Sequence, residues 1–267
     1  MPATNVNYEP VRDIFEAMRA ETLDGAPLSE VIGGGDPEQI ASATLVLLSR
    51  YISVKSKRSI LDVGCGCGRI ATALTQNISS TSHYVGVDIV PALVQFGRDV
   101  ISPRYPNFKF ILLDESNKTY DPFRSTGDSY DIAKLSDACP AGSIDLAISI
   151  SLFTHLDYEP AFEILAAINR MLVRGGHAFI TFFVLDADAW DGIEANRTGF
   201  RFRHRTPSGK LYSDKWLDPT HSVGYGPDQL DELAGSAGLQ IHQWIRGFWS
   251  QGHEGETFQD ALILRKL

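Results

Sequence analysis

The sequence predicts an α/β fold with a Rossmann-like, mostly parallel sheet and helices on both faces. Short apolar segments bounded by turn residues alternate with helical segments over residues 59–185. Buried strands in this rhythm are typical of a parallel sheet covered on both sides. Near the end of the chain, two apolar segments (240–249 and 259–266) follow one another without a helix between them. Strands joined in this way pair antiparallel, so we expect an antiparallel last strand.

The first 56 residues are expected to form a helical cap. Residues 9–21 repeat apolar side chains at helical spacing, and residues 37–54 start with Pro37, a residue favoured at the first helical position. The α/β core is assigned to residues 57–182. Its expected strands are 59–64, 83–89, 108–114, 144–151 and 176–185, and its expected helices are 69–77, 91–101 and 159–172.

The last third of the chain departs from this rhythm. Residues 183–224 show little regular pattern, and an insertion of this length beside a sheet is typical of a lid, so we expect a substrate lid there. Residues 225–267 contain an amphipathic segment (227–239) and the two final apolar segments. We expect this part to complete the core with a helix and an antiparallel hairpin.

Composition limits the class of protein. The chain has 267 residues, 43% of them hydrophobic, and a formal net charge of −9. An acidic balance disfavours nucleic acid as a partner. The apolar runs are too short to span a bilayer as helices. The three cysteines make a poor disulfide framework, and the N-terminus lacks a secretory pattern. We expect a reduced, cytoplasmic protein, and the sequence does not decide its oligomeric state.

The most informative motif is LDVGCGCGR at residues 61–69. It lies where the first core strand turns into a helix, which is where open α/β sheets bind ligands. A dinucleotide fingerprint needs a glycine where Arg69 stands, and a phosphate loop needs a lysine that is missing. Cys65 and Cys67 do not have the spacing of zinc ligands. What remains is D-x-G-x-G-x-G, with Asp62 opposing a pyrophosphate and favouring a cationic amine.

Two further carboxylates end the next strands. Asp88 is placed to accept hydrogen bonds from both hydroxyls of a ribose, and Asp114 to meet the exocyclic amine of a base. An amine, a ribose and a base without a phosphate describe S-adenosyl-L-methionine. Asp114 also fits a simple turn, because aspartate favours such positions.

Several segments of the sequence resemble the class I S-adenosylmethionine-dependent methyltransferases. They are ILDVGCGCGRIATAL, YVGVDI, FILLDESNKTYDP, IDLAISISLFTHL, INRMLVRGGHAFIT and QDALILRK. The resemblance covers residues 57–182 well and the tail moderately. It implies a seven-stranded sheet with its last strand antiparallel. The phrases NKTYDP, SLFTHL and QDALILRK also resemble a bacterial subgroup associated with O-methylation of glycans and small molecules.

The resemblance also implies which residues bind the cofactor. The backbone of Gly64, Cys65 and Gly66 would surround the methionine end, with Asp62 near its amine. Arg69 would pair with the methionine carboxylate and Asp88 would hold the ribose. The remaining residues expected at the cofactor are Ile89, Asp114 and Ser151.

The acceptor is expected to be an oxygen atom. Nucleobase amino-methyltransferases of this fold carry a proline pair after the fourth strand, and this chain has SISLFTHL there. His155 in that segment is a suitable general base for a hydroxyl, although it also fits a structural role in the turn. The cations and rings of residues 197–216 suit an acceptor that is anionic, sugar-like or both, and they also fit a solvated β-hairpin whose arginines pair with acids elsewhere. No ligand spacing selects a metal site, so no metal is predicted.

The function expected from the sequence is therefore an O-methyltransferase acting on a glycan or another small molecule. Two alternatives stay open. One is a methyltransferase acting on RNA or protein, because a basic aromatic strip can also hold single-stranded RNA. The other is a module that binds the cofactor without turnover.

Overall fold

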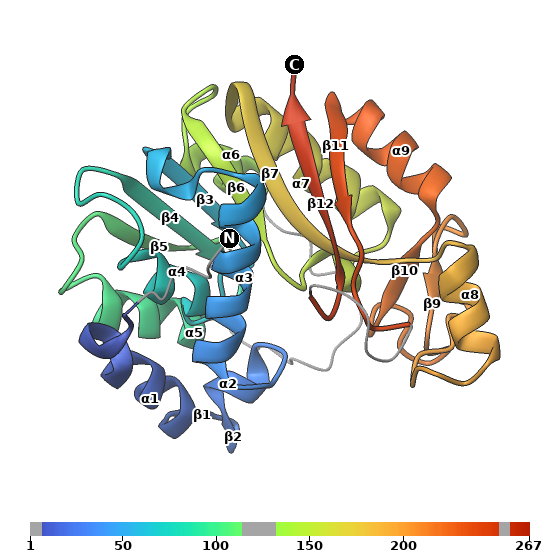
Figure 1. The fold of residues 1–267 in the computed structure, drawn as a ribbon, viewed down its shortest axis with the longest axis horizontal. Helices are drawn as coiled ribbons and strands as arrows, with labels where there is room; N and C mark the ends of the chain where they lie inside the picture. The colour runs from blue at the N-terminus through green and yellow to red at the C-terminus, as the bar shows by residue number, and fades with distance from the viewer. Residues whose placement is uncertain (1–6, 114–131, 251–256) are drawn as a thin grey trace. The chain divides into compact units, whose positions relative to one another are not determined.

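The computed structural model describes residues 7–113, 132–250 and 257–267. The chain divides into two compact units. The first unit comprises Met1–Lys118 with Ile144–Leu146, and the second comprises Thr119–Ser143 with Ala147–Leu267. Helices and strands of both units carry the labels of Figure 1.

The first unit begins with the expected helices. Its N-terminal elements are η1 (Glu9–Val11), α1 (Arg12–Ala20), β1 (Thr22–Leu23), β2 (Ala26–Pro27), α2 (Leu28–Val31), α3 (Pro37–Tyr51) and η2 (Val54–Ser56). Helix α3 starts as predicted, because Pro37 occupies its first turn and the carboxylate of Asp36 accepts a hydrogen bond from the backbone N–H of Gln39 at 2.9 Å. Asp36 also pairs with Arg19 of α1 at 2.7 Å, which ties the two helices together.

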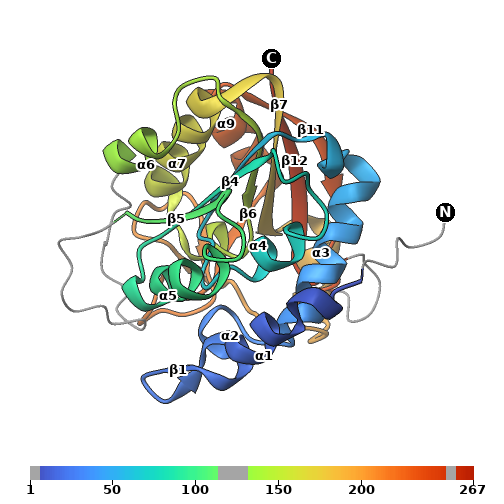
Figure 2. The ribbon, with the colours of Figure 1, turned by 90° about the vertical axis from the view of Figure 1, so that its left-hand side faces the viewer.

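The sheet of the first unit has three parallel strands in the order β5-β4-β3. They are β3 (Ser59–Val63), β4 (His83–Asp88) and β5 (Phe108–Leu112), and their helical partners are α4 (Arg69–Leu74), α5 (Pro91–Phe96) and the π-turn η3 (Gly97–Ile101). Figure 2 shows β4 and β5 with α4 and α5 nearby. The first residues of β6 (Ile144–Ser149) adjoin β3, since Asp145 accepts backbone hydrogen bonds from Arg58 and Ser59.

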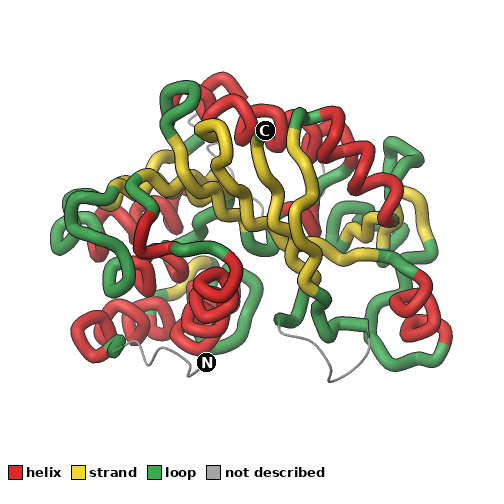
Figure 3. The backbone as a smooth tube through the Cα atoms, turned by 45° about the horizontal axis from the view of Figure 1, so that its top comes forward, coloured by secondary structure: helices red, strands yellow, loops and turns green. Residues whose placement is uncertain are grey.

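The second unit is built around a long strand, β7 (Leu172–Val184). The last strand, β12 (Asp260–Lys266), pairs antiparallel with β7 on one side and with β11 (Leu239–Ile245) on the other. Figure 3 shows β12 ending at the C-terminus. Outside residues 183–224, the helices described in this unit are α6 (Ile132–Ala138), η4 (Phe153–His155), α7 (Tyr158–Met171) and α9 (Pro227–Ser236). The antiparallel last strand that the sequence predicted is confirmed.

The segment expected to be an irregular lid contains regular structure. It holds α8 (Ala187–Glu194) and three short strands, β8 (His204–Arg205), β9 (Tyr212–Ser213) and β10 (Val223–Tyr225). Phe202 and Leu211 are fully buried, and Phe202 packs against Phe183 and Trp249. The expectation of little regular pattern was wrong, because strands of two or three residues are too short to show a period of two.

None of the helices in the described ranges is long and apolar enough to cross a membrane. Within the same residues, no group of three or more histidine, cysteine or acidic side chains is placed to hold a metal ion.

Candidate functional site

The glycine run forms a tight turn between β3 and α4 in the first unit. Gly64, Gly66 and Gly68 have φ angles of 76°, 55° and 90°. Residues other than glycine rarely adopt this left-handed conformation. The backbone N–H groups of Gly64 and Cys65 both donate to the carbonyl of Val87, at 2.9 and 3.1 Å. These bonds hold the turn against the end of β4.

The same turn is approached closely by other parts of the first unit. A Cβ atom at Gly66 would lie 2.7 Å from Cγ2 of Ile32, the residue that follows α2. A Cβ atom at Gly68 would lie 2.6 Å from Cδ1 of Ile101. Packing within the unit therefore favours glycine at both positions, whether or not a ligand also approaches the turn. The sequence indicated a close approach but not that Ile32 makes it, because that contact joins residues distant in the chain.

Asp88 connects the glycine turn to the end of β4. Its side chain is buried, and its two carboxylate oxygens accept hydrogen bonds from the backbone N–H groups of Gly66 (2.8 Å) and Val90 (2.9 Å). Burial raises the pKa of Asp88, while these backbone bonds act in the opposite direction. Each carboxylate oxygen keeps a second lone pair, so the group can still accept hydrogen bonds from two ligand hydroxyls. Ile89, the next residue, is half-buried.

Asp62 is buried beside the glycine turn, and among the described residues it has one side-chain hydrogen-bond donor. The hydroxyl of Tyr84 donates to its Oδ2 atom at 2.7 Å. Burial, with a smaller contribution from the charge of Asp88, raises the pKa of Asp62 to about 7. The sequence analysis did not find Tyr84. The signal that could have found it is the strand register, because Tyr84 lies two residues before Gly86, which pairs with Asp62 in the sheet.

Arg69 starts helix α4 and is only 7% exposed. Among the described residues its guanidinium has no ion-pair partner, and its one hydrogen bond is a long contact of 3.5 Å from Nη1 to the carbonyl of Gly34. Burial lowers the pKa of Arg69, which the nearby charge of Asp62 partly offsets. A buried guanidinium with so few partners fits an anionic group of a ligand.

The two cysteines of the turn are buried thiols. Burial raises the pKa of Cys65 well above its usual range and that of Cys67 to about 12. Both remain protonated near neutral pH, which suits the role of small turn residues that the sequence favoured over metal ligands. Asp114 lies outside the described residues.

In the second unit, Ser151 follows β6 in a strained conformation. Its φ angle is 60°, in the left-handed region that costs of order 1–3 kcal/mol for a residue other than glycine. Its backbone N–H donates to Oγ1 of Thr181 at 2.7 Å, and its own hydroxyl donates to Oε1 of Gln259 at 3.1 Å. Thr181 and Gln259 were not found from the sequence, because Thr181 lies on β7 and Gln259 just before β12, both distant from Ser151 in the chain.

His155 ends the short helix η4 that follows Ser151. The turn is held by Tyr225, a fully buried residue whose hydroxyl donates to the carbonyl of Leu156 at 2.7 Å and lies 2.9 Å from that of Phe153. Nδ1 of His155 lies 3.2 Å from the carbonyl oxygen of Thr220. A carbonyl oxygen only accepts, so in the neutral imidazole Nδ1 carries the proton and Nε2 has the free lone pair.

The ring of His155 keeps an exposed surface, yet the chain around it desolvates the imidazolium. Its pKa is therefore lowered from 6.5. A neutral imidazole with a free Nε2 can take a proton near pH 7.

Several cations of residues 197–216 are engaged within the second unit. The guanidinium of Arg201 donates to the carbonyls of Thr198 and Phe200 and to the side chain of Asn196. Arg205 lies 3.9 Å from the ring centroid of Tyr212 and donates to its hydroxyl. These contacts stabilise the segment itself, so its positive charge is not all directed to a ligand.

Comparisons with known proteins identify the family and the fold of the chain. A model of the methyltransferase domain family matches residues 36–243. The match covers most of the chain, and the protein belongs to this family. It is therefore an S-adenosylmethionine-dependent methyltransferase, and S-adenosylmethionine is its cofactor.

Solved structures show the same fold at low sequence identity. A methyltransferase from Methanosarcina mazei is 16% identical over 83% of this chain and 97% of its own, with a TM-score of 0.53. The 1,6-didemethyltoxoflavin-N1-methyltransferase of Burkholderia thailandensis, with S-adenosylhomocysteine bound, is 17% identical over 86% and 79%, with a TM-score of 0.52. The [4+2]-cyclase SpnF is 19% identical over 90% and 91%, with a TM-score of 0.56. The predicted mostly parallel, Rossmann-like α/β fold is confirmed.

Proposed function

We propose that the protein transfers the methyl group of S-adenosylmethionine to a hydroxyl oxygen of a glycan or another small molecule, with His155 as the general base. The observation that carries this proposal is the contact of Nδ1 of His155 with the carbonyl of Thr220, which leaves Nε2 unprotonated. An alcohol is a poor nucleophile until its proton leaves, and a positioned imidazole is suited to remove it.

The residues of the first unit fit the cofactor. In this proposal Asp62 binds the amine, Arg69 the carboxylate and Asp88 the ribose hydroxyls. The few partners of the buried Arg69 support this assignment, because a carboxylate would supply the missing counter-charge. When bound, S-adenosylmethionine supplies a methyl group on a positively charged sulfur. The backbone of residues 64–66, Ile89 and Ser151 are proposed as further contacts, and so is Asp114.

The parts of the chain have proposed roles as well. Residues 1–56 form a cap, residues 57–182 the cofactor-binding core, residues 183–224 a substrate lid, and residues 225–267 the completion of the core. The contact of Ile32 with Gly66 supports a role for the cap at the glycine turn. The indole of Trp216, which is 72% exposed in the lid segment, supports an acceptor with a flat apolar face, such as a sugar or a phenol.

A mass-shift screen tests the proposed function. The protein is incubated with S-adenosylmethionine bearing a deuterated methyl group and with separate panels of methyl glycosides, glycolipids, phenols, amines, an RNA mixture and a peptide mixture. We expect a labelled product only from hydroxyl compounds, and fragmentation should place the label on oxygen. Labelling confined to amines, RNA or peptides would contradict the proposal.

A further inference from the structure

The second unit contains a polar cluster of Ser151, Thr181 and Gln259 that the proposed base does not use. The side-chain oxygen of Gln259 accepts two hydrogen bonds, from the hydroxyl of Thr181 at 2.6 Å and from that of Ser151 at 3.1 Å. Thr181 in turn accepts the backbone N–H of Ser151 at 2.7 Å. The three residues therefore fix one another's orientation.

This arrangement directs the other half of the Gln259 amide away from the cluster. Because Oε1 is held by two hydroxyls, the amide plane is set and the Nε2 group must point elsewhere. Nε2 has no hydrogen-bond partner within the part of the chain that the structure describes. Gln259 is half-buried, so this amide donor is partly desolvated but still reachable.

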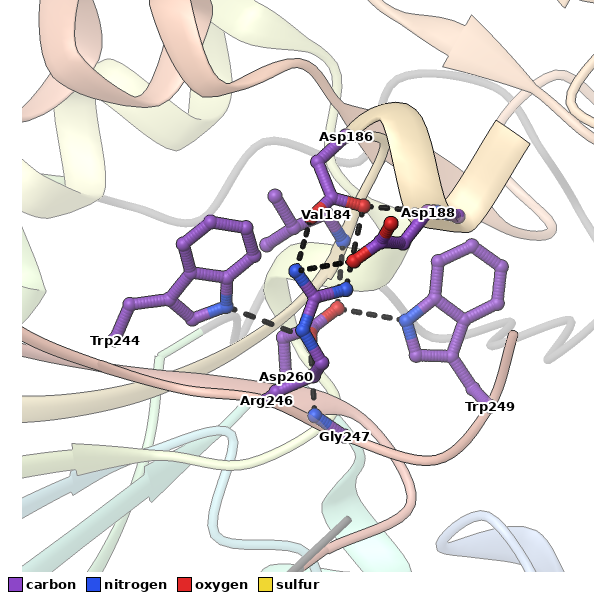
Figure 4. A network of polar contacts seen from close by, with 9 residues as sticks. Val184, Asp186, Asp188, Trp244, Arg246, Gly247, Trp249 and Asp260 are labelled. Carbon is purple, nitrogen blue, oxygen red and sulfur yellow. Dashed lines mark hydrogen bonds and ion pairs between the residues drawn. The ribbon is translucent and has the colours of Figure 1, made fainter. Parts of the chain in front are cut away.

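The backbone at Gln259 is fixed by its neighbour, the buried Asp260. Figure 4 shows the carboxylate of Asp260 surrounded by donors from several segments. It accepts hydrogen bonds from the backbone N–H groups of Val184 and Gly247, at 2.9 Å each, and from the indole N–H of Trp249 at 2.6 Å. Since these bonds hold the first residue of β12, the Gln259 side chain projects from a rigid base.

The position of the cluster in the sheet suits a ligand. Asp260 pairs with Phe182 near the carboxyl end of β7, and Ser151 lies two residues beyond Ser149, the last residue of β6. Ligands of open α/β sheets bind outside the carboxyl ends of the parallel strands. The left-handed φ angle of 60° at Ser151 is a strained feature at the same place, and such strain persists where the surrounding contacts enforce it.

We propose that Gln259, oriented by Ser151 and Thr181, forms an acceptor subsite in which its Nε2 group donates a hydrogen bond to an uncharged oxygen of the acceptor. This inference rests on the proposed function and adds the chemistry of a second acceptor atom, a hydroxyl or ether oxygen beside the one that is methylated. An uncharged oxygen is favoured because the cluster contains no cation and its neighbour Asp260 is a carboxylate. Gln259 is a positioning residue in this scheme, and it transfers no proton.

The test uses Gln259→Glu in the full-length protein. A glutamate can keep one oxygen in the place of Oε1, where the two hydroxyls donate, and it replaces only the Nε2 donor with an acceptor. Gln259→Met is a second, uncharged variant in case the added charge disturbs folding. Gln240→Glu, an exposed glutamine on β11, is the matched control for the added charge. Thermal unfolding and calorimetry with S-adenosylhomocysteine establish that each variant is folded and binds cofactor.

Turnover is measured with the hydroxyl panels of the screen, namely methyl glycosides, glycolipids and phenols. We expect the KM of the methylated compound to rise and kcat/KM to fall about 10- to 100-fold in Gln259→Glu and Gln259→Met, with cofactor affinity unchanged. Gln240→Glu should behave as wild type.

Analogues of that compound that lack one oxygen at a time separate positioning from a structural role. Removing the one acceptor oxygen that Gln259 contacts should lower kcat/KM of the wild-type protein. The same removal should have little further effect on kcat/KM of Gln259→Glu, because that variant has already lost the hydrogen bond to this oxygen. Additive losses for every analogue, or wild-type kinetics in both variants, would overturn the subsite and leave the proposed function intact. A wild-type protein that methylates none of these hydroxyl compounds would overturn the proposed function and the subsite with it.

Discussion

At the scale of single residues, the proposed contact of Asp62 with the cofactor amine should make cofactor binding dependent on pH. Its pKa of about 7 means that the free protein is partly protonated at this site near neutrality. In the proposed site a cationic amine favours the ionised form and lowers this pKa. Above pH 7 the carboxylate is already ionised and affinity should be constant, whereas below pH 7 a proton must leave on binding. Affinity should then fall by up to about tenfold per pH unit.

Calorimetry in buffers of different ionisation enthalpy checks this prediction, because it counts the protons released with S-adenosylhomocysteine. Asp62→Asn is the control, and its affinity should be weaker and independent of pH in the same range. An affinity of the wild-type protein that stays flat from about pH 8 to pH 6 would contradict a contact between Asp62 and the amine.

His155 is the second residue with a predicted effect. Replacing His155 with glutamine should reduce kcat by about 10²–10⁴-fold, the usual contribution of a positioned base, with cofactor affinity near wild type. In the wild type, activity should rise with pH through an apparent pKa below 6.5, because desolvation lowers the pKa of the imidazole. The checks are steady-state rates across pH with the acceptor found in the screen. His242→Gln, on the exposed face of β11, is the control. Rates of His155→Gln within about threefold of wild type would exclude His155 as the general base.

The sequence predicted those site residues whose positions are set by a local motif, and it missed those that depend on contacts between distant residues. Asp62, Arg69 and Asp88 stand at fixed offsets from the ends of strands, so the sequence singled them out. Tyr84 and Gln259 contact Asp62 and Ser151, residues distant from them in the chain, and no local sequence pattern indicates such contacts. The protonation of Asp62 also had no sequence signal, since burial raises its pKa.

At the scale of elements, Ile32 of the segment proposed as a cap lies against the glycine turn at Gly66. Gly66→Ala should lower the free energy of unfolding by about 2–4 kcal/mol, from the left-handed φ angle of 55° and from the overlap of Cβ with Ile32. In an Ile32→Ala background the same change should cost at least about 1 kcal/mol less, because the overlap is gone. Urea unfolding of the four proteins measures both values. Equal costs in the two backgrounds would show that the cap does not press on the turn.

The sequence predicted most of the helices and strands. The predicted elements are helices α1, α3, α4, α5, α7 and α9, strands β3 to β7, and the antiparallel strands β11 and β12. The elements that the sequence missed are short: β1, β2, α2, α6, α8, and β8 to β10. They are stabilised by tertiary packing, such as that of the buried Phe202 against Trp249, and local propensity does not report it.

At the scale of the whole molecule, the two ligands of the proposed reaction are assigned to different parts of the chain. Most of the described residues that we propose to bind the cofactor lie in the first unit, at the glycine turn and the end of β4. The proposed base His155 and the proposed positioning residue Gln259 lie in the second unit. A ligand that binds the folded state slows local opening of the backbone around its contacts.

Hydrogen exchange measured by mass spectrometry therefore distinguishes the two assignments. S-adenosylhomocysteine should slow exchange most in peptides covering residues 62–69 and 86–90. An acceptor found in the screen, added to the protein with S-adenosylhomocysteine, should slow exchange further in peptides covering 151–156.

A nicotinamide dinucleotide should protect neither region, because Arg69 replaces the glycine that its pyrophosphate requires and Asp62 opposes its charge. Protection by the dinucleotide equal to that by S-adenosylhomocysteine would contradict the assignment of the glycine turn. Acceptor protection that leaves residues 151–156 unchanged would contradict the roles given to Ser151 and His155.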